Sequence, residues 1–213
     1  MKKINWRYTF GELLIVITGI TIAFWLNNWK ESREEEILAE EYLANLRTDL
    51  QRDIDTLAYS IVELKRSKEF VKRYINGIMN PELRNDSISQ KIYKLAQTEI
   101  FTEHNATFST LINSGDIKLI KNLELRTAIV DQYNMYKDLH LKEEIHLNYL
   151  TDYLGPFMIK NYYYAKGMQT EIDVWQDREL INLIFSSYGM MQQTLKAYEQ
   201  AQVSAATLVE KLN

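Results

Sequence analysis

The 213-residue sequence contains no cysteine and only two prolines and seven glycines. Without cysteine there can be no disulfide bond, thiolate zinc site, iron–sulfur cluster or cysteine nucleophile. Proline and glycine are the residues that most often interrupt helices, so their scarcity favours long helices. The sequence also lacks a Gly-rich phosphate loop, an HExxH zinc motif and a serine nucleophile elbow. We therefore expect an all-α protein that is not an enzyme and holds no cofactor.

What the sequence does contain is an apolar run near its N-terminus. Leu13 to Leu26 carries no charged residue. A helix that spans a bilayer needs about 20 residues, and residues 9–28 supply them if Glu12 lies one turn inside. A cleaved signal peptide is the main alternative, because an apolar run of 14 residues also suits one. Since the run continues directly into a strongly helical segment, we predict a retained transmembrane helix.

The aromatic and basic residues around this run fit a membrane anchor. The flanking aromatic residues are Trp6, Tyr8, Phe10, Trp25 and Trp29, and the basic residues on the N-terminal side are Lys2, Lys3 and Arg7. Basic residues concentrate on the cytoplasmic side of a span. We therefore predict a cytoplasmic tail over residues 1–8, a transmembrane helix over 9–28, and an extracytoplasmic domain over 29–213 at a bacterial inner membrane.

The charge of the predicted extracytoplasmic domain excludes one class of partner. Residues 34–213 carry 20 basic and 27 acidic side chains. Binding to nucleic acid depends on lysine and arginine at the phosphates. A net-acidic domain without a basic stripe is therefore not expected to bind nucleic acid, and the lipid bilayer is the first partner that the sequence indicates.

A long helix is expected to continue from the span as far as Gly77, Asn80 and Pro81. Its apolar residues recur in steps of three and four, so they form one stripe. The stripe consists of Leu43, Leu46, Leu50, Ile54, Leu57, Ile61, Leu64, Val71 and Ile75, and Lys68 fills the gap in its spacing. Such a stripe suits either a coiled coil between two copies or the core face of an intramolecular bundle. We favour the bundle because later segments offer matching faces.

Capping residues mark the later helices. We expect short helices from Asn85 through Ala96 and from Asn105 to Gly115, a second long helix from Asn122 to Gly155–Pro156, an aromatic connection over Phe157–Lys166, and a last helix capped by Asp173 or Asp177. This last helix is too polar to be a second membrane-spanning helix.

Two stretches of the sequence resemble a known group of proteins. The first is Gly11-Glu12, the run through Gly19 and Ala23, and Asn27-Asn28-Trp29 before a charged helix. The second is Ser114-Gly115-Asp116-Ile117-Lys118-Leu119-Ile120-Lys121-Asn122, followed by Leu123-Glu124-Leu125-Arg126 and Tyr133. Together they resemble a family of uncharacterised single-pass proteins common in Bacteroidota. The resemblance implies an anchored helical architecture and assigns no catalytic residue.

Three residues of the predicted span are candidates for pairing with another membrane helix. Glu12 places a carboxylate at the edge of the hydrocarbon, which is costly unless it reaches the interface, is protonated or pairs. Gly19 and Ala23 have the small-xxx-small spacing that lets helices approach closely. Single-pass subunits of proton-driven complexes share this plan but carry an aspartate deeper in the span.

The predicted bundle offers two further candidate sites. Glu143 and His146 have the Glu-x-x-His spacing of di-iron bundles, but it occurs once, so we expect exposed polar residues and no metal. Tyr162, Tyr163 and Tyr164 are a possible partner surface, although tyrosines in bundles mostly fill the core.

These observations favour a membrane-anchored scaffold or protein-interaction module in the cell envelope, paired with a second copy or with another membrane protein. Two alternatives remain open. One is a ligand-sensing bundle that signals through a partner, and the other is an accessory subunit of a proton-driven complex that uses Glu12.

Overall fold

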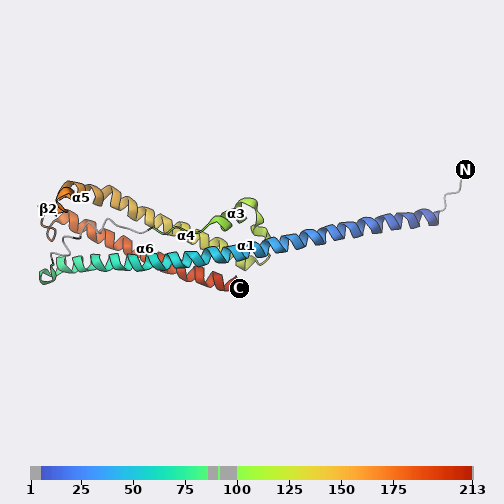
Figure 1. Ribbon diagram of the computed structural model, residues 1–213, viewed down its shortest axis with the longest axis horizontal. Coiled ribbons are helices and arrows are strands. Elements are labelled where there is room, and N and C mark those ends of the chain that lie inside the picture. Colours follow the sequence, from blue (N-terminus) through green and yellow to red (C-terminus); the bar gives the residue numbers. More distant parts are fainter. Residues whose placement is uncertain (1–5, 86–90, 92–99, 213) are drawn as a thin grey trace.

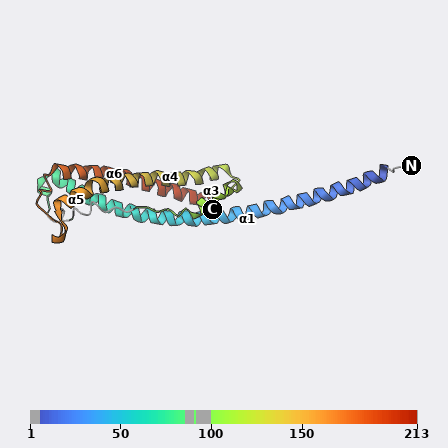
Figure 2. The ribbon, with the colours of Figure 1, turned by 90° about the horizontal axis from the view of Figure 1, so that it is seen from above.

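A computed structural model describes residues 6–85, 91 and 100–212, with no account of the side chains of residues 6–9. It confirms the all-α fold: three long helices lie side by side, and one of them extends far beyond the other two (Figures 1 and 2). The helices are α1 (Trp6–Met79), η1 (Pro81–Leu83), α3 (Ala106–Ser114), η3 (Asp116–Leu119), α4 (Leu123–Tyr149), η4 (Leu150–Leu154), α5 (Gly155–Asn161), η5 (Tyr164–Lys166) and α6 (Arg178–Lys211).

Helix α1 is a single element of 74 residues, which corresponds to a length of about 110 Å. It ends at Met79, as the sequence predicts, because Asn80 and Pro81 start a separate turn in which the Asn80 side chain accepts a hydrogen bond from the Glu82 N–H. Its C-terminal half packs in the bundle, whereas its N-terminal half projects away from it (Figure 1). The element thus joins the apolar run and the bundle without a break.

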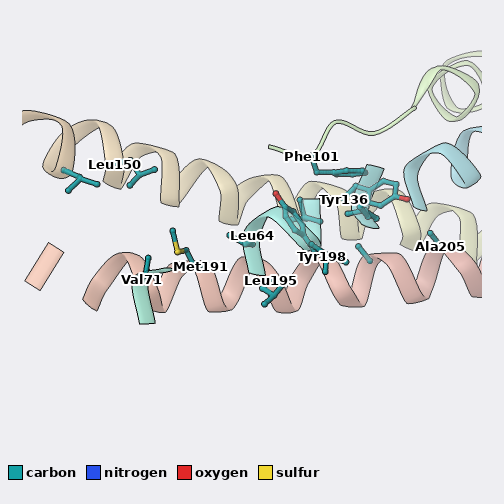
Figure 3. Close-up of a cluster of buried hydrophobic side chains, with 14 of the residues drawn as sticks. Leu64, Val71, Phe101, Tyr136, Leu150, Met191, Leu195, Tyr198 and Ala205 are labelled. Atoms are coloured by element: carbon teal, nitrogen blue, oxygen red, sulfur yellow. The ribbon is translucent and has the colours of Figure 1, made fainter. Parts of the chain in front are cut away.

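The apolar stripe of α1 is the core face of the bundle, which confirms the intramolecular interpretation. Leu46, Leu50 and Leu57 are completely buried, and the neighbouring turns contribute Ile61, Leu64 and Val71. Facing residues come from α6, such as Met191 and Tyr198, and from α4, such as Tyr136 (Figure 3). Lys68, in the gap of the stripe, is partly exposed, and its ammonium lies 5.5 Å from the centre of the Tyr188 ring.

The second long helix does not stop at Gly155–Pro156, so that prediction is wrong. A π-helical turn, η4, follows α4, and α5 then continues to Asn161. In this turn the Gly155 N–H donates to the carbonyl of Leu150, five residues earlier. Proline in a regular α-helix loses a hydrogen bond and clashes with the preceding turn. The wider π-turn accommodates Pro156 and lets the chain remain helical.

The aromatic connection predicted over Phe157–Lys166 is instead partly helix and partly hairpin. Phe157 is buried in α5, and β1 (Tyr162–Tyr163) pairs with β2 (Gln169–Thr170) in antiparallel register. Gly167 and Met168 make the turn with φ of 71° and 64°. This hairpin lies at the end of the bundle opposite the projecting part of α1 (Figure 1).

Most of the predicted caps are confirmed. The side chains of Asn122 and Asp177 accept hydrogen bonds from the N–H groups of Leu125 and Leu180. Gly115 ends α3 with a left-handed φ of 76°, which glycine adopts at no steric cost. Asn105 precedes α3 but makes no side-chain cap. The helix predicted from Asn85 through Ala96 falls almost entirely on residues 86–90 and 92–99, outside the described part.

Candidate functional site

The first part of α1, up to Leu26, is an apolar helix that no described residue covers. Every side chain from Glu12 to Leu38 is exposed. The large apolar ones before Asn27 are Leu13, Leu14, Ile15, Val16, Ile17, Ile20, Ile22, Phe24, Trp25 and Leu26. Soluble monomers rarely expose a contiguous apolar surface of this size. The helix is long and apolar enough to cross a membrane.

The three candidate pairing residues lie on one face of this helix. Gly19 and Ala23 follow Glu12 by seven and eleven residues, which places each of them within about 20° of Glu12, on either side of it, around a helix that turns 100° per residue. Nothing lies within 4 Å of the position of a Cβ on Gly19. Thr21, on the other side, donates its hydroxyl to the carbonyl of Ile17 within the same helix. The face is therefore accessible to another helix.

Short elements hold α1 where it leaves the bundle. The Tyr42 hydroxyl donates to Asp116 of η3 at 3.0 Å, and the Lys121 ammonium lies 3.3 Å from the Glu36 carboxylate. The Lys121 ammonium also contributes to lowering the pKa of Glu36, first through its hydrogen bond and then through its charge. These contacts hold η3 and Lys121, the second residue after it, beside the base of the projecting helix.

The segment before α3, residues Ile100–Asn105, has no regular secondary structure, and we call it the latch. The carbonyl of its last residue, Asn105, accepts the first hydrogen bond of α3 from the Ser109 N–H. The backbone before Asn105 is bound by side chains. The Phe101 N–H donates to Glu143 of α4 at 2.8 Å, and the His104 N–H donates to Asp53 of α1 at 2.7 Å. The Phe101 side chain is completely buried, with its ring 5.1 Å from that of Tyr136 (Figure 3).

His140 lies between two carboxylates in this cluster. Its Nε2 is 2.5 Å from Glu103 of the latch, and its Nδ1 is 2.8 Å from Glu143. Burial alone would lower the pKa of His140, but the hydrogen bonds and charges of Glu103 and Glu143 outweigh it and raise that pKa above its usual value. For Glu103, burial opposes the shift, yet the bond from His140 leaves its pKa below the ordinary value.

Asp53 is a second buried acid of the cluster, with no exposed surface. Its carboxylate accepts from the backbone N–H of His104 and lies 2.9 Å from the His104 ring. Burial raises the pKa of Asp53 in spite of these bonds. The Tyr133 hydroxyl donates to the His104 carbonyl, so both sides of the latch backbone are bound.

The expectation that Glu143 and His146 are exposed polar residues is wrong, because both are buried. Glu143 accepts from the Tyr198 hydroxyl as well as from the latch, while His146 lies 3.3 Å from the Ser187 hydroxyl and has its pKa lowered by burial. The two side chains thus have separate partners. Among the described residues no group of three or more His, Asp or Glu side chains is arranged to hold a metal ion.

The sequence matches the model of a known protein family over residues 12–190, which is most of its length. The chain belongs to DUF6090, a family of unknown function. No curated protein and no solved structure matches it. The part matched to DUF6090 begins at Glu12 and includes the apolar run, the latch and His140.

Sequence reasoning missed the latch of this DUF6090 member. The sequence signal for this cluster is His140-x-x-Glu143, a spacing that brings the two side chains together on one helix. The same stretch contains the Glu-x-x-His spacing of Glu143 and His146, which is the more familiar metal-binding motif. Of the three tyrosines proposed as a surface, Tyr163 and Tyr164 are more than half exposed. Tyr162 is 6% exposed and packs in the core.

Proposed function

We propose that this chain is a single-pass membrane protein of the bacterial inner membrane. Residues 9–28 span the bilayer, and residues 29–213 form an extracytoplasmic domain. The domain acts as a scaffold or protein-interaction module and not as an enzyme. The observation that carries this proposal is the exposed apolar part of α1 up to Leu26, because burying it in hydrocarbon is the arrangement that removes it from water. The resemblance to anchored proteins of Bacteroidota supports the same reading.

A charged stalk would separate the bundle from the lipid. Residues 29–41 continue α1 with mainly charged side chains, and the first fully buried core residue is Leu46. Thirteen helical residues correspond to about 20 Å, and the bundle contacts this stretch at Glu36, through Lys121. The stalk would therefore hold the bundle clear of the headgroups, where it can meet other envelope proteins. The basic residues Lys2, Lys3 and Arg7 favour a cytoplasmic N-terminus.

The proposed topology can be tested by labelling, because the natural chain has no cysteine. We expect a membrane-impermeant maleimide to label Ser32→Cys in intact spheroplasts. We expect Lys3→Cys to react only after the membrane is permeabilised. Both variants should stay in the membrane fraction after alkaline carbonate extraction, because a spanning helix is not released by removing electrostatic contacts.

Two results would contradict the proposal. One is labelling of Lys3→Cys but not of Ser32→Cys in intact spheroplasts, which would reverse the orientation. The other is a soluble chain that has lost its first residues, which would identify the apolar run as a cleaved signal.

We further propose that the face formed by Glu12, Gly19 and Ala23 pairs with the same face of a second copy. Small residues allow two backbones to approach closely in lipid, where packing contributes much of the association energy. Gly19→Leu should therefore convert an oligomer into a monomer when the full chain is extracted in mild detergent. Light scattering of the protein–detergent complex measures the change.

Thr21→Leu is the matched control, since it enlarges a small residue on the opposite side of the same helix. It should leave the mass of the complex unchanged. Equal masses for the natural chain and Gly19→Leu would refute pairing through this face. Co-purification of a different membrane protein in fixed ratio would replace the second copy by that partner.

A further inference from the structure

The bundle leaves one side of α1 uncovered. The buried residues of α1 between Leu46 and Leu64 pack in the core with α4 and α6, and the latch and α3 contact an adjoining side through Asp53 and Asp49. Helix α1 accordingly lies along one edge of the bundle in Figure 2. The exposed residues on the side away from the core form what we call the back face of α1: Ala44, Thr48, Arg52, Asp55, Tyr59 and Val62.

The back face continues the face formed by Glu12, Gly19 and Ala23 in the span. Each residue of an α-helix adds about 100° of rotation, and α1 is one unbroken helix. Thr48 follows Glu12 by about ten whole turns of 3.6 residues, and the rest of the back face lies within about 40° of the line that joins these two residues. The buried Leu57 lies about 180° away from that line. The candidate pairing face and the core face are therefore on opposite sides of one helix.

The back face carries the exposed apolar side chains of this part of α1. Between Leu38 and Met79, the large apolar residues that α1 exposes are Tyr59 and Val62, at 59% and 54%. They are three residues apart, so they are neighbours on the helix surface. Covering this pair with apolar side chains would remove it from water, which is favourable.

The charges of the stalk are arranged so that a second stalk can lie beside it. Near the line from Glu12 to Thr48 the stalk exposes Ile37 and mixed charges, among them the ion pair of Lys30 with Glu34 at 3.6 Å. Two parallel stalks that meet along this line would therefore direct most of their acids away from each other. The acids that lie about 80–140° from the line are Glu31, Glu35, Glu36 and Glu40.

A two-fold axis would bring complementary side chains together. Two copies anchored with the same orientation are parallel, so a residue on one side of the contact line meets a residue from the other side of the line in the second copy. Arg52 lies about 40° to one side and Asp55 about 20° to the other, about 4.5 Å apart along the axis. Arg52 of each copy would thus approach Asp55 of the other. Tyr59 and Val62 are related in the same way.

Arg52 and Asp55 are available for such a contact. Within the chain, neither side chain forms an ion pair with any residue that the structure describes. Charge pairs across an interface mainly fix its register and exclude other partners. The apolar pair would supply the burial, and the charged pair would select the alignment.

We propose that two copies of this chain pair along α1 from the span as far as Val62, with their back faces in contact and α4 and α6 on the outside. This inference rests on the proposed pairing through Glu12, Gly19 and Ala23, and adds the surface of the extracytoplasmic domain that takes part. It requires two nearly parallel α1 helices. A pair that crosses at about 20° near Gly19, as many membrane helices do, would be displaced by about 15 Å at Thr48.

Cysteine cross-linking of the full chain in the membrane tests the proposal, because the natural chain has no cysteine. Helices that pack about 8–10 Å apart bring facing Cα atoms to about 4–6 Å, which suits a disulfide. We expect Thr48→Cys to form a covalent dimer of twice the chain mass on mild oxidation. Arg47→Cys is the matched control, since Arg47 is also exposed but points about 100° away. Its yield of dimer should be at least about tenfold lower.

Charge reversal tests the contact between Arg52 and Asp55. In the Thr48→Cys background, Asp55→Arg should lower the yield of dimer several-fold, because it places two arginines against each other. Adding Arg52→Asp should restore the yield, because the two charges are then exchanged. A double variant that cross-links no better than Asp55→Arg would overturn the proposed arrangement.

Failure of this inference can be distinguished from failure of the pairing in the span. If Thr48→Cys does not cross-link but Gly19→Leu still dissociates the oligomer, the span pairs and the back face does not. If Thr48→Cys cross-links and Gly19→Leu leaves the mass unchanged, the back face pairs without the span face. Equal yields for Thr48→Cys and Arg47→Cys would indicate random collisions and overturn the proposal. A cross-linked product that contains a different protein would also overturn it.

Discussion

The free energy of unfolding is expected to fall by about 2–5 kcal/mol when Leu57 is replaced by alanine. Leu57 is completely buried where α1 packs in the bundle. Alanine would remove apolar contact and leave a cavity that the three rigid helices cannot close. Urea denaturation of the full chain in detergent, followed by circular dichroism, measures the loss.

Leu38 provides the matched control for this prediction. It lies on the same helix but is 38% exposed in the stalk. Leu38→Ala should change the free energy of unfolding by less than about 0.5 kcal/mol. Similar losses for both variants would mean that the stalk is packed against something in the isolated protein, which contradicts a projecting helix.

Replacing Glu143 by alanine should cost about 3–5 kcal/mol, the range found when one partner of a buried ionic network is removed. Three groups lose an acceptor at once: the Phe101 N–H, the Tyr198 hydroxyl and the His140 ring. Buried donors without an acceptor are costly. The same urea titration at pH 7 measures the effect.

Glu144→Ala is the control, because it removes an exposed carboxylate one residue further along the helix. Its effect should be within about 0.5 kcal/mol. Glu143→Gln, which keeps one side-chain oxygen as acceptor, should lose less than Glu143→Ala. If Glu143→Ala is as stable as the natural chain, Glu143 does not hold the latch.

The sequence predicts the long elements because their signals are local and periodic. Steps of three and four residues identify the stripe that includes Leu46 and Leu57, and the caps at Asn122 and Asp177 are single residues with a fixed geometry. The apolar run can also be recognised directly from the sequence, because no charged residue interrupts it. These features require no knowledge of what lies elsewhere in the chain.

The latch could not be predicted in this way. Phe101 and Glu143 are 42 residues apart, and His104 and Asp53 are 51 apart, so no local pattern relates them. A segment without regular secondary structure also has no periodic pattern of apolar residues. The π-turn before Pro156 was missed for a different reason, because proline usually ends a helix and only the packing of α5 shows that it does not.

Because α1 is unbroken, it fixes how the bundle is rotated about the helix axis relative to the first part of that helix. Each residue of an α-helix advances it by about 100° and 1.5 Å, and no glycine or proline lies between Gly19 and Gly77 to relax that relation. One residue inserted into the stalk would turn the whole bundle by more than a quarter of a circle relative to the face formed by Glu12, Gly19 and Ala23. Seven inserted residues would nearly restore the direction while raising the bundle by about 10 Å. The number of residues in the stalk therefore determines which side of the bundle faces a neighbour.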